Sequence, residues 1–251
     1  MTTASAASPP AHAPELAGQT VVVIGGSAGI GLETARRARA EGADVILAAR
    51  DPAKLERAAG ELGARGTAAF DATDPDALRD FFAGLPSPVD HVMVTAGGPY
   101  YAPLDEIDFA EALRHLDGEL LGPLRLARHA AERVRPGGTL VFMGGTGARR
   151  PARGLTLIGA VTAALPALVA NLAVELAPVR VNLVAAGFVD TPLSATLLGE
   201  GLETRRRQLR ETLPIGRVVG PADVAALAVH LMANTALTGA TYDVDGGQQL
   251  V

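Results

Sequence analysis

Short apolar runs rich in valine alternate with longer stretches of helical composition from Thr20 to the end of the sequence. Strands separated by helices need crossover connections, and these connections produce a parallel sheet with helices on both faces. The sequence therefore predicts a single doubly wound α/β domain over residues 19–251, built on a seven-stranded parallel sheet. The runs expected to form its strands cover residues 20–25, 44–49, 66–70, 90–97, 138–144 and 180–186, with a last strand around Thr241.

The composition is consistent with one domain and argues against binding of nucleic acid, membrane surfaces and metal ions. The chain has 251 residues, of which 48% are hydrophobic, so it can bury a sizeable core. Its net charge is −5 and it has no long basic run, which argues against nucleic acid and anionic membrane surfaces as partners. It has no cysteine, and its five histidines lack metal-ligand spacing, so no metal site is expected.

The first 18 residues are rich in alanine, proline and serine. They have neither the basic start nor the apolar centre of a signal peptide, so we expect a disordered tail. A cytoplasmic location is the corresponding expectation.

Residues 155–174 form a long apolar segment, and about 20 such residues can cross a bilayer. The segment contains Pro166 and Asn171 and runs directly into Glu175. These residues favour a helix buried by the sheet and by a partner subunit.

A glycine-rich turn lies between the first predicted strand and the first predicted helix. Residues 25–31 read Gly-Gly-Ser-Ala-Gly-Ile-Gly. Glycines at this point allow a tight turn and let a pyrophosphate approach the backbone at the positive end of the helix. This Rossmann-like arrangement assigns Gly25, Ser27, Gly29, Ile30 and Gly31 to the binding of a dinucleotide.

Two other kinds of site use a similar turn. A Walker-type phosphate loop needs a lysine at the start of the helix, but the only lysine is Lys54, beyond the second strand. Residues 25–29 also fit the G-x-S-x-G pattern of a hydrolase nucleophile elbow, which follows several strands rather than the first. We therefore interpret the turn as a dinucleotide site, in which Ser27 bonds a phosphate or its own backbone.

The residue after the second strand indicates which dinucleotide is bound. An acidic residue there would bind a ribose 2′-hydroxyl, but this strand is followed by Arg50. A guanidinium beside the Ser27 hydroxyl suits a 2′-phosphate, so NADP(H) is the expected cofactor. The alternative is that Arg50 only pairs with Asp51 or faces solvent. Asp71 and Ala72, after the third strand, are placed beside the adenine, although Asp71 can also serve as a turn residue.

Further motifs follow the turn along the chain. They are Val-Thr-Ala-Gly at 94–97, Arg-Val-Asn at 180–182, Gly-Phe-Val-Asp-Thr-Pro at 187–192, Leu-Pro-Ile-Gly-Arg at 213–217 with Pro221, and Val-Asp-Gly-Gly at 244–247. With the turn, they resemble the short-chain dehydrogenase/reductase superfamily. The resemblance implies cofactor contacts by Ala96, Gly97 and Gly187, and a nicotinamide carboxamide held by Thr191 and the Val189 backbone. It also implies that subunits pair through long helices into a dimer or tetramer.

The positions that carry catalysis in that superfamily hold other residues here. Its serine falls on Gly145, its tyrosine on Ile158, its lysine on Thr162 and its helix-four asparagine on Glu119. The sequence has no Tyr-x-x-x-Lys pattern anywhere, because the residues four positions after its three tyrosines are Leu104, Asp105 and Gly246. A positioned acid contributes about 10²–10⁴-fold to a reaction that needs a proton. The usual tyrosine-dependent conversion of alcohols and ketones is therefore rejected.

The main hypothesis is a reductase whose small-molecule acceptor tolerates the missing acid. An imine or iminium, or a conjugated C=C bond, is such an acceptor. Tyr101 and Thr146 are the preferred proton donors or orienting hydroxyls, with Tyr100 and a protonated Glu119 as further donors. The residues expected at the substrate are Tyr100, Gly145, Arg150 and Ile158. Arg149, Arg150 and Arg153 can clamp an anionic group of the substrate or remain solvated.

Two alternatives stay open. A protein that binds NADP(H) without turnover can act as a sensor, scaffold or partner subunit. An isomerase or cyclase can also use the same pocket without a redox step.

Overall fold

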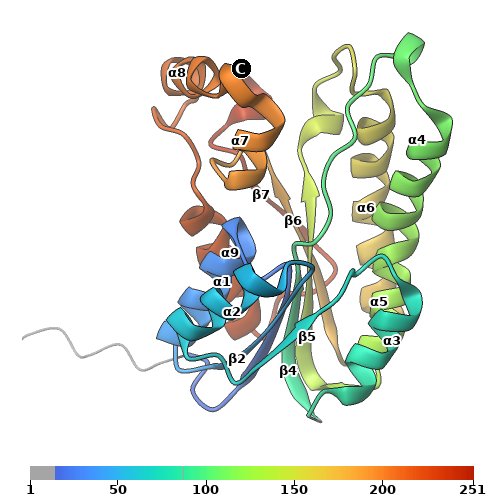
Figure 1. The fold of residues 1–251 in the computed structure, drawn as a ribbon, viewed down its shortest axis with the longest axis vertical. Helices are drawn as coiled ribbons and strands as arrows, with labels where there is room; N and C mark the ends of the chain where they lie inside the picture. The colour runs from blue at the N-terminus through green and yellow to red at the C-terminus, as the bar shows by residue number, and fades with distance from the viewer. Residues whose placement is uncertain (1–14, 87) are drawn as a thin grey trace, which may run out of the picture.

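The computed structural model describes residues 15–86 and 88–251, so most of the predicted tail lies outside it. The sheet has seven parallel strands in the order β3-β2-β1-β4-β5-β6-β7 (Figure 1). The predicted doubly wound Rossmann-like fold is therefore confirmed. The strands are β1 (Thr20–Ile24), β2 (Asp44–Ala49), β3 (Gly66–Ala69), β4 (Val89–Val94), β5 (Val134–Gly145), β6 (Arg180–Ala186) and β7 (Thr241–Val244).

Helices cover both faces of this sheet (Figure 1). One layer contains α1 (Gly29–Ala40), α2 (Pro52–Leu62) and α9 (Pro221–Ala233). The other contains α3 (Pro75–Gly84), α4 (Phe109–Leu116), α5 (Gly122–Ala130) and α6 (Thr156–Glu175), with a π-helical turn, η2 (Asp117–Leu121), between α4 and α5. α7 (Pro192–Leu198) and α8 (Leu202–Thr212) follow β6 and extend beyond one end of the sheet.

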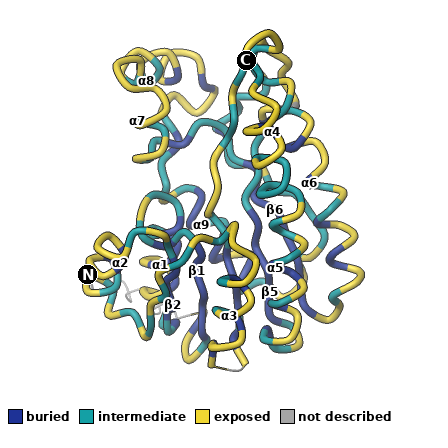
Figure 2. The backbone as a smooth tube through the Cα atoms, turned by 45° about the vertical axis from the view of Figure 1, so that its right-hand side comes forward, coloured by how far each residue is buried: buried dark blue, intermediate teal, exposed yellow. Residues whose placement is uncertain are grey.

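Alternation along each strand sends side chains into two separate cores. In β1, Val22 and Ile24 pack with residues of α3, α5 and α6, whereas Val21 and Val23 pack with residues of α1 and α9. All four are buried, and each such side chain contributes about 1.5–3 kcal/mol. Figure 2 shows the central strands buried and the outer helix surfaces exposed. Burial on both faces explains why these strands are apolar throughout.

The folded part begins before the predicted boundary at residue 19. Residues 15–18 form a turn in which Leu16 is fully buried. The Leu16 amide donates to the Glu41 carbonyl at 3.0 Å, and the side chain packs into the core that α1 and α9 cover. A lone apolar residue next to an Ala/Pro/Ser-rich segment is too weak a signal to reveal this contact.

β5 also begins earlier than expected, at Val134 rather than 138. Its register against β4 shifts between Val89 and His91, which accommodates the extra residues. Gly137 there has a φ of +80°, and a Cβ on Gly138 would lie 2.3 Å from the Asp90 carbonyl oxygen. These two glycines resemble a turn in the sequence, but here they let an irregular strand continue.

α6 is the one described helix that is long and apolar enough to cross a membrane by length and composition. In this fold it lies along β6. The residues that it buries are Ile158, Val161, Thr162, Leu165, Val169, Leu172 and Ala173. The sheet thus covers one face, as predicted, and a partner subunit on its other face stays a prediction.

The strands end together at one edge of the sheet, and this edge positions the site. Ile24 pairs with Ala48 on one side and with Val94 on the other, and Val94 pairs with Phe142. From this edge β1 continues into α1 on one face of the sheet, whereas β4 leads to α4 on the opposite face. Doubly wound sheets bind their ligands at such a switch point.

Candidate functional site

The glycine turn rests against the end of β4. Gly25 has a φ of +93°, and a Cβ on it would lie 2.4 Å from Oγ1 of Thr95. A Cβ on Gly31 would lie 2.3 Å from the Gly25 carbonyl oxygen. Thr95 Oγ1 is 3.3 Å and 3.2 Å from the Ile24 and Gly25 carbonyl oxygens, to which it can donate. Thr95 is absent from the predicted site residues, yet it fixes the turn.

The start of α1 has the properties of an anion site. α1 begins at Gly29, and the preceding residue, Ala28, supplies no side-chain cap. The first amides of the helix are therefore left for a ligand or water. A Cβ on Gly29 would lie 3.5 Å from Cβ of Thr191, so the turn touches the segment after β6. The predicted residues of the turn and Thr191 are thus neighbours in the fold.

A cavity of about 200 Å³ lies beside the turn. Its lining residues are Ser27, Leu32, Lys54, Arg57, Ala58 and Glu61. Ser27 is one of the predicted residues, whereas Lys54 and Arg57 are cations of α2 that the sequence did not assign to the site. Their spacing of one helical turn shows that they share a face of α2, but not that this face is turned toward Ser27.

Arg50 is exposed after β2, and in the described structure it forms no ion pair. Its predicted alternative partner, Asp51, instead caps α2 by accepting the Lys54 amide at 3.0 Å. The pKa of Asp71 is lowered, first by the Thr73 amide, which donates to Oδ1 at 2.9 Å, and less by the charge of Arg50. Asp71 is thus a turn residue through Oδ1, and Ala72 lies inside that turn.

A carboxyl group lies against the two glycines that follow β4. Glu119 belongs to η2, and its Oε1 is 2.6 Å from the place that a Cβ on Gly97 would take. Gly97 has a φ of +124°, and the Gly98 amide donates to the Glu119 carboxyl. Desolvation raises the pKa of Glu119, and the bond from Gly98 opposes that rise. The predicted residues Ala96 and Gly97 are therefore next to a carboxyl that retains its proton more readily than a free one.

Small or apolar side chains line the end of β5 and the facing turn of α6. A Cβ on Gly145 would lie 3.3 Å from Cγ2 of Thr162. The Thr162 hydroxyl bonds within its own helix, to the Ile158 carbonyl at 2.9 Å. Ile158 is 9% exposed and Thr146 is 5% exposed. The Thr146 amide donates to the Ala186 carbonyl at 3.0 Å, and no described residue bonds its hydroxyl.

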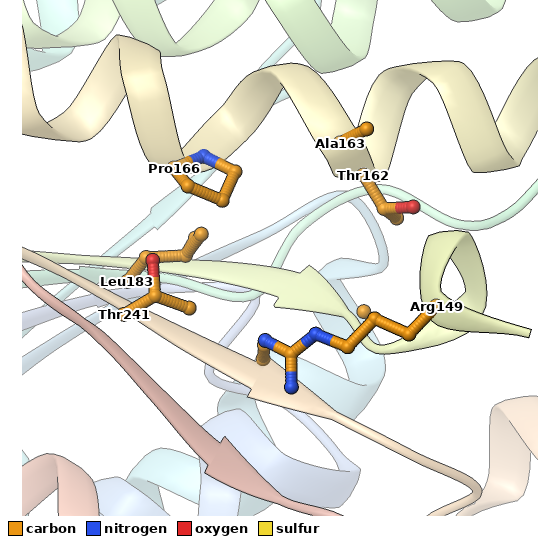
Figure 3. Close-up of a pocket in the computed structure, with 8 residues that line it drawn as sticks. Arg149, Thr162, Ala163, Pro166, Leu183 and Thr241 are labelled. Carbon is orange, nitrogen blue, oxygen red and sulfur yellow. The ribbon is translucent and has the colours of Figure 1, made fainter. Parts of the chain in front are cut away.

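A second cavity, of about 240 Å³, opens between α6 and the sheet (Figure 3). It is lined by Gly145, Arg149, Thr162, Ala163, Pro166, Leu183, Ala185 and Thr241. Figure 3 shows the Arg149 side chain extending across one end of this cavity. The cavity begins at Gly145 and Thr162, so the lack of larger side chains at these positions leaves it open.

The three arginines after β5 are not equivalent. The Arg149 guanidinium bonds both carboxylate oxygens of Asp243 and also the Gln249 amide oxygen at 2.7 Å. Arg153 pairs with Asp105 at 3.1 Å. Arg150 is exposed and forms no ion pair with a described residue. Of the three, Arg150 is thus the one whose charge no ion pair within the described chain neutralises.

The two tyrosines after β4 also differ. The Tyr100 hydroxyl accepts a bond from the Asp108 amide at 3.0 Å, and its ring centroid is 6.1 Å from that of His115. Tyr101 is 56% exposed, and desolvation raises the pKa of its phenol. The Ala102 amide donates to the Gly154 carbonyl at 3.2 Å, so this loop lies beside the segment that enters α6. Tyr100 therefore has a structural bond, whereas no described residue bonds the Tyr101 hydroxyl.

The segment after β6 is held by local contacts. A Cβ on Gly187 would lie 2.8 Å from Cβ of Asp245. Val189 is buried and forms a parallel bridge with Val219. Thr191 Oγ1 accepts the Ser194 amide at 3.2 Å and so caps α7. These three predicted cofactor residues lie at the same edge of the sheet as the glycine turn.

Known proteins resemble this chain over nearly all of its length. A family model described as enoyl-(acyl carrier protein) reductase matches residues 25–249. The 3beta-hydroxysteroid dehydrogenase 1 of Eggerthella lenta is 31% identical over 252 residues, covering 94% of this chain and 95% of that protein.

Two solved structures agree with these matches. The MalC reductase/Diels-Alderase from Malbranchea aurantiaca is 26% identical with a TM-score of 0.87, covering 95% of this chain and 99% of that chain. A small-chain dehydrogenase in complex with NADPH is 26% identical with a TM-score of 0.80, covering 93% of this chain and 99% of that chain. With its fold, its glycine turn and its later motifs, the chain therefore belongs to the short-chain dehydrogenase/reductase family of oxidoreductases.

Proposed function

We propose that the protein is an NADP(H)-dependent reductase of a small activated acceptor, an imine, an iminium or a conjugated C=C bond. The observation that carries the proposal is the contrast between the two halves of the site. The turn beside β1 keeps the requirements of a dinucleotide site, whereas residues 145, 158 and 162 are glycine, isoleucine and threonine. The acceptor must therefore react without a tyrosine acid and without a lysine cation.

The residues present fit the phosphates of such a dinucleotide. Gly25 and Gly31 leave no room for a Cβ, and no side chain caps the start of α1. Ser27, Lys54 and Arg57 share the cavity beside the turn, and Arg50 is exposed after β2. Three cations and a hydroxyl suit a 2′-phosphate better than a 2′-hydroxyl. The NADPH bound to one structural relative supports the same choice.

We assign the binding of the adenine and of the nicotinamide to the other predicted residues. Asp71 Oδ2 and the Ala72 backbone are assigned to the adenine side. At the opposite end, Ala96, Gly97, Gly187, Val189 and Thr191 are assigned to the nicotinamide half. When bound, the reduced nicotinamide supplies a hydride.

Two hydroxyls without partners in the described chain are assigned to the acceptor. Thr146 lies directly after Gly145, and Tyr101 lies in the loop that contacts residue 154. Arg150 is assigned to an anionic substituent of the substrate, and Ile158 to an apolar part. Tyr100 contacts the substrate through its ring, since its hydroxyl already accepts the Asp108 amide. The relative named reductase/Diels-Alderase supports a reductase of this kind.

Fluorescence titration with NADPH and NADH tests the cofactor. We expect NADPH to bind more tightly, and Arg50→Ala to weaken NADPH by about tenfold while leaving NADH unchanged, because one charge-assisted bond is lost. Equal affinities would contradict the role of Arg50.

A panel of ketones, cyclic imines and enones with NADPH tests the reaction. We expect turnover of imines or enones and little turnover of ketones. Binding of NADPH without turnover of any acceptor would instead favour a silent binding protein or an isomerase.

We also propose that the protein is cytoplasmic and self-associates. Apolar residues with large exposed fractions gather on α4, η2 and α5: Phe109 at 77%, Leu113 at 68%, Leu121 at 47% and Leu124 at 43%. Such a surface suits a second copy of the chain. Light scattering after size-exclusion chromatography should give a dimer or tetramer, and Leu113→Asp should shift it toward the monomer.

A further inference from the structure

Glu119 lies at the switch point of the sheet. The sequence names it only as a further proton donor after Tyr101 and Thr146, and the proposed function gives it no role. Glu119 belongs to the π-helical turn η2, which lies on the face of the sheet opposite to α1 and the glycine turn (Figure 1). A π turn adds one residue to a helix and so changes where the following side chain points, and such turns are frequent at functional sites. Here Glu119 Oε1 lies 2.6 Å from where Gly97 would carry a Cβ. A side chain larger than hydrogen at Gly97 would displace the carboxyl from this place.

The pKa of this carboxyl is set by burial and by one backbone amide rather than by the charges on the elements around η2. α6 packs against η2 and carries no charged residue at 156–174. Asp117 of η2 is neutralised by Arg125 of α5, with both bonds at 2.7 Å. The other titratable groups on the packed elements are Glu111, Arg114 and His115 on α4 and Arg128 and His129 on α5, with Asp71 in the loop that faces Gly118 through Thr73. None of these groups contributes to the pKa of Glu119, which desolvation raises and the Gly98 amide lowers.

We infer that Glu119 is the proton donor of this reductase and that the preferred acceptor is a neutral imine rather than a ketone. The inference rests on the proposed function and narrows its acceptor class. The Glu119 carboxyl group lies beside Gly97 and Gly98, which follow β4, and in its protonated form it can give a proton to a basic nitrogen. A ketone oxygen is far less basic, so the same acid serves it poorly before the hydride arrives.

The reaction balances with these groups. The O–H bond of Glu119 breaks and an N–H bond forms, which gives an iminium next to a carboxylate. Bound NADPH would supply a hydride to the iminium carbon, so the acceptor would be reduced by two electrons to an amine and the cofactor would leave as NADP⁺. The Glu119 carboxylate regains its proton from water.

Two related probes separate proton donation from every other role of Glu119. In alkaline buffer 3,4-dihydroisoquinoline is a neutral imine and needs a proton, whereas N-methyl-3,4-dihydroisoquinolinium carries its charge at every pH. We expect Glu119→Gln to lower kcat/KM for the neutral imine by about 100-fold or more. Reduction of the N-methyl iminium and the dissociation constant of NADPH should both stay within about threefold of wild type. Glu111→Gln, an exposed change on α4, is the matched control and should affect neither probe.

The outcomes distinguish this inference from the proposed function. Equal loss on both probes would assign Glu119 to binding or folding and overturn the inference, and so would the absence of any loss. A wild-type protein that reduces the iminium but not the neutral imine would also overturn it, while the proposed reductase would stand. A wild-type protein that reduces no imine, iminium or enone would reject the proposed function itself.

Infrared spectroscopy gives a readout without the cofactor. The difference between wild type and Glu119→Gln over a pH series isolates the carbonyl band of the protonated carboxyl. We expect its midpoint above the ordinary glutamate value of about 4.3. Adding 3,4-dihydroisoquinoline should lower that midpoint, because the proton moves to nitrogen. A midpoint at or below the ordinary value, or one that the imine leaves unchanged, would contradict the inference.

Discussion

Gly25 and Thr95 approach each other so closely that a Cβ on Gly25 would lie 2.4 Å from the threonine hydroxyl oxygen. The sequence explains this glycine by the approach of a phosphate to the backbone. The structure adds a second reason, because the end of β4 fills the space that a side chain would need. The same contact therefore joins the ends of the two central strands at the edge where we expect the dinucleotide to bind.

We expect Gly25→Ala to lower the free energy of unfolding by about 3 kcal/mol, because it combines a strained φ with a steric clash. Gly60→Ala is the matched control. Gly60 lies in α2 with no atom within 4 Å of its Cβ position, so alanine should stabilise the protein by about 0.5–1 kcal/mol. Urea unfolding of both variants measures these changes. A loss below about 1 kcal/mol for Gly25→Ala would show that the turn can relax.

Lys54→Ala and Arg57→Ala should each weaken NADPH about tenfold or more and leave NADH almost unchanged. The reason is that each removes a charge-assisted bond, worth about 1.5–3 kcal/mol, from the cavity that contains Ser27. Arg79→Ala is the control, since Arg79 lies on α3 and does not line this cavity. Equal weakening of both dinucleotides would assign the two cations to a phosphate that NADPH and NADH share.

The sequence predicts the strands and the turn because both depend on neighbouring residues. Buried parallel strands are apolar throughout, and the glycines stand directly between strand and helix. The cations of the cavity are different. Lys54 and Arg57 line one cavity with Ser27 only because α2 packs beside β2. Their spacing in the sequence does not show which way this face of the helix points.

Contacts between distant residues are also invisible in the sequence. The sequence allows Arg149 to bind an anionic group of the substrate, but in the structure its guanidinium pairs with Asp243, 94 residues later. Glu119 lies against Gly97 from the π turn η2. The residues of this region contain no pattern from which a π turn can be predicted. The roles of Tyr101 and Thr146 stay predictions, since their hydroxyls bond no described residue.

Arg180 joins β6 to the end of α9, and its loss should be costly. Arg180 is 6% exposed. Its guanidinium donates to the carbonyls of Leu231, Met232, Asn234 and Leu237 at 2.7, 2.8, 3.0 and 3.0 Å. A lysine has no fork with which to reach all four, so Arg180→Lys should cost about 3 kcal/mol or more. Arg207→Lys, an exposed change on α8, should cost almost nothing, and similar effects for the two variants in urea unfolding would refute this account.

Stability should fall in weak acid because of His91. Burial lowers the pKa of this histidine from 6.5 to about 3; Asp90 opposes the shift, whereas Arg180 and Arg135 add to it. The unfolded chain thus takes up a proton below pH 6.5, whereas the folded protein does so only near pH 3. The contribution of neutral His91 is complete above pH 6.5 and is lost as the pH falls, by about 2 kcal/mol between pH 7 and pH 5. His91→Gln should remove this part of the slope in urea unfolding, and an unchanged slope would exclude His91 as its source.

The effects of Gly145→Ser and Thr162→Lys on stability should not be additive. Serine and lysine are the residues that the family resemblance implies at these two positions. A Cβ on Gly145 would lie 3.3 Å from Cγ2 of Thr162, so Gly145→Ser crowds that methyl group. Lysine is unbranched at Cβ, and the cavity of about 240 Å³ beside residue 162 has room for its chain. We therefore expect Gly145→Ser to be less destabilising in the Thr162→Lys background, with a coupling of about 0.5–2 kcal/mol in a double-mutant cycle.

Adding Ile158→Tyr to this pair supplies an acid and a cation at the end of β5. The triple variant should reduce ketones with NADPH at least about 100-fold faster than the parent, since a positioned acid contributes about 10²–10⁴-fold. NADPH absorbance measures that rate, and fluorescence titration checks that the variant still binds the dinucleotide. A triple variant that binds NADPH and remains inactive on ketones would mean that the shape of the pocket, and not the lack of a proton donor, keeps ketones from reacting.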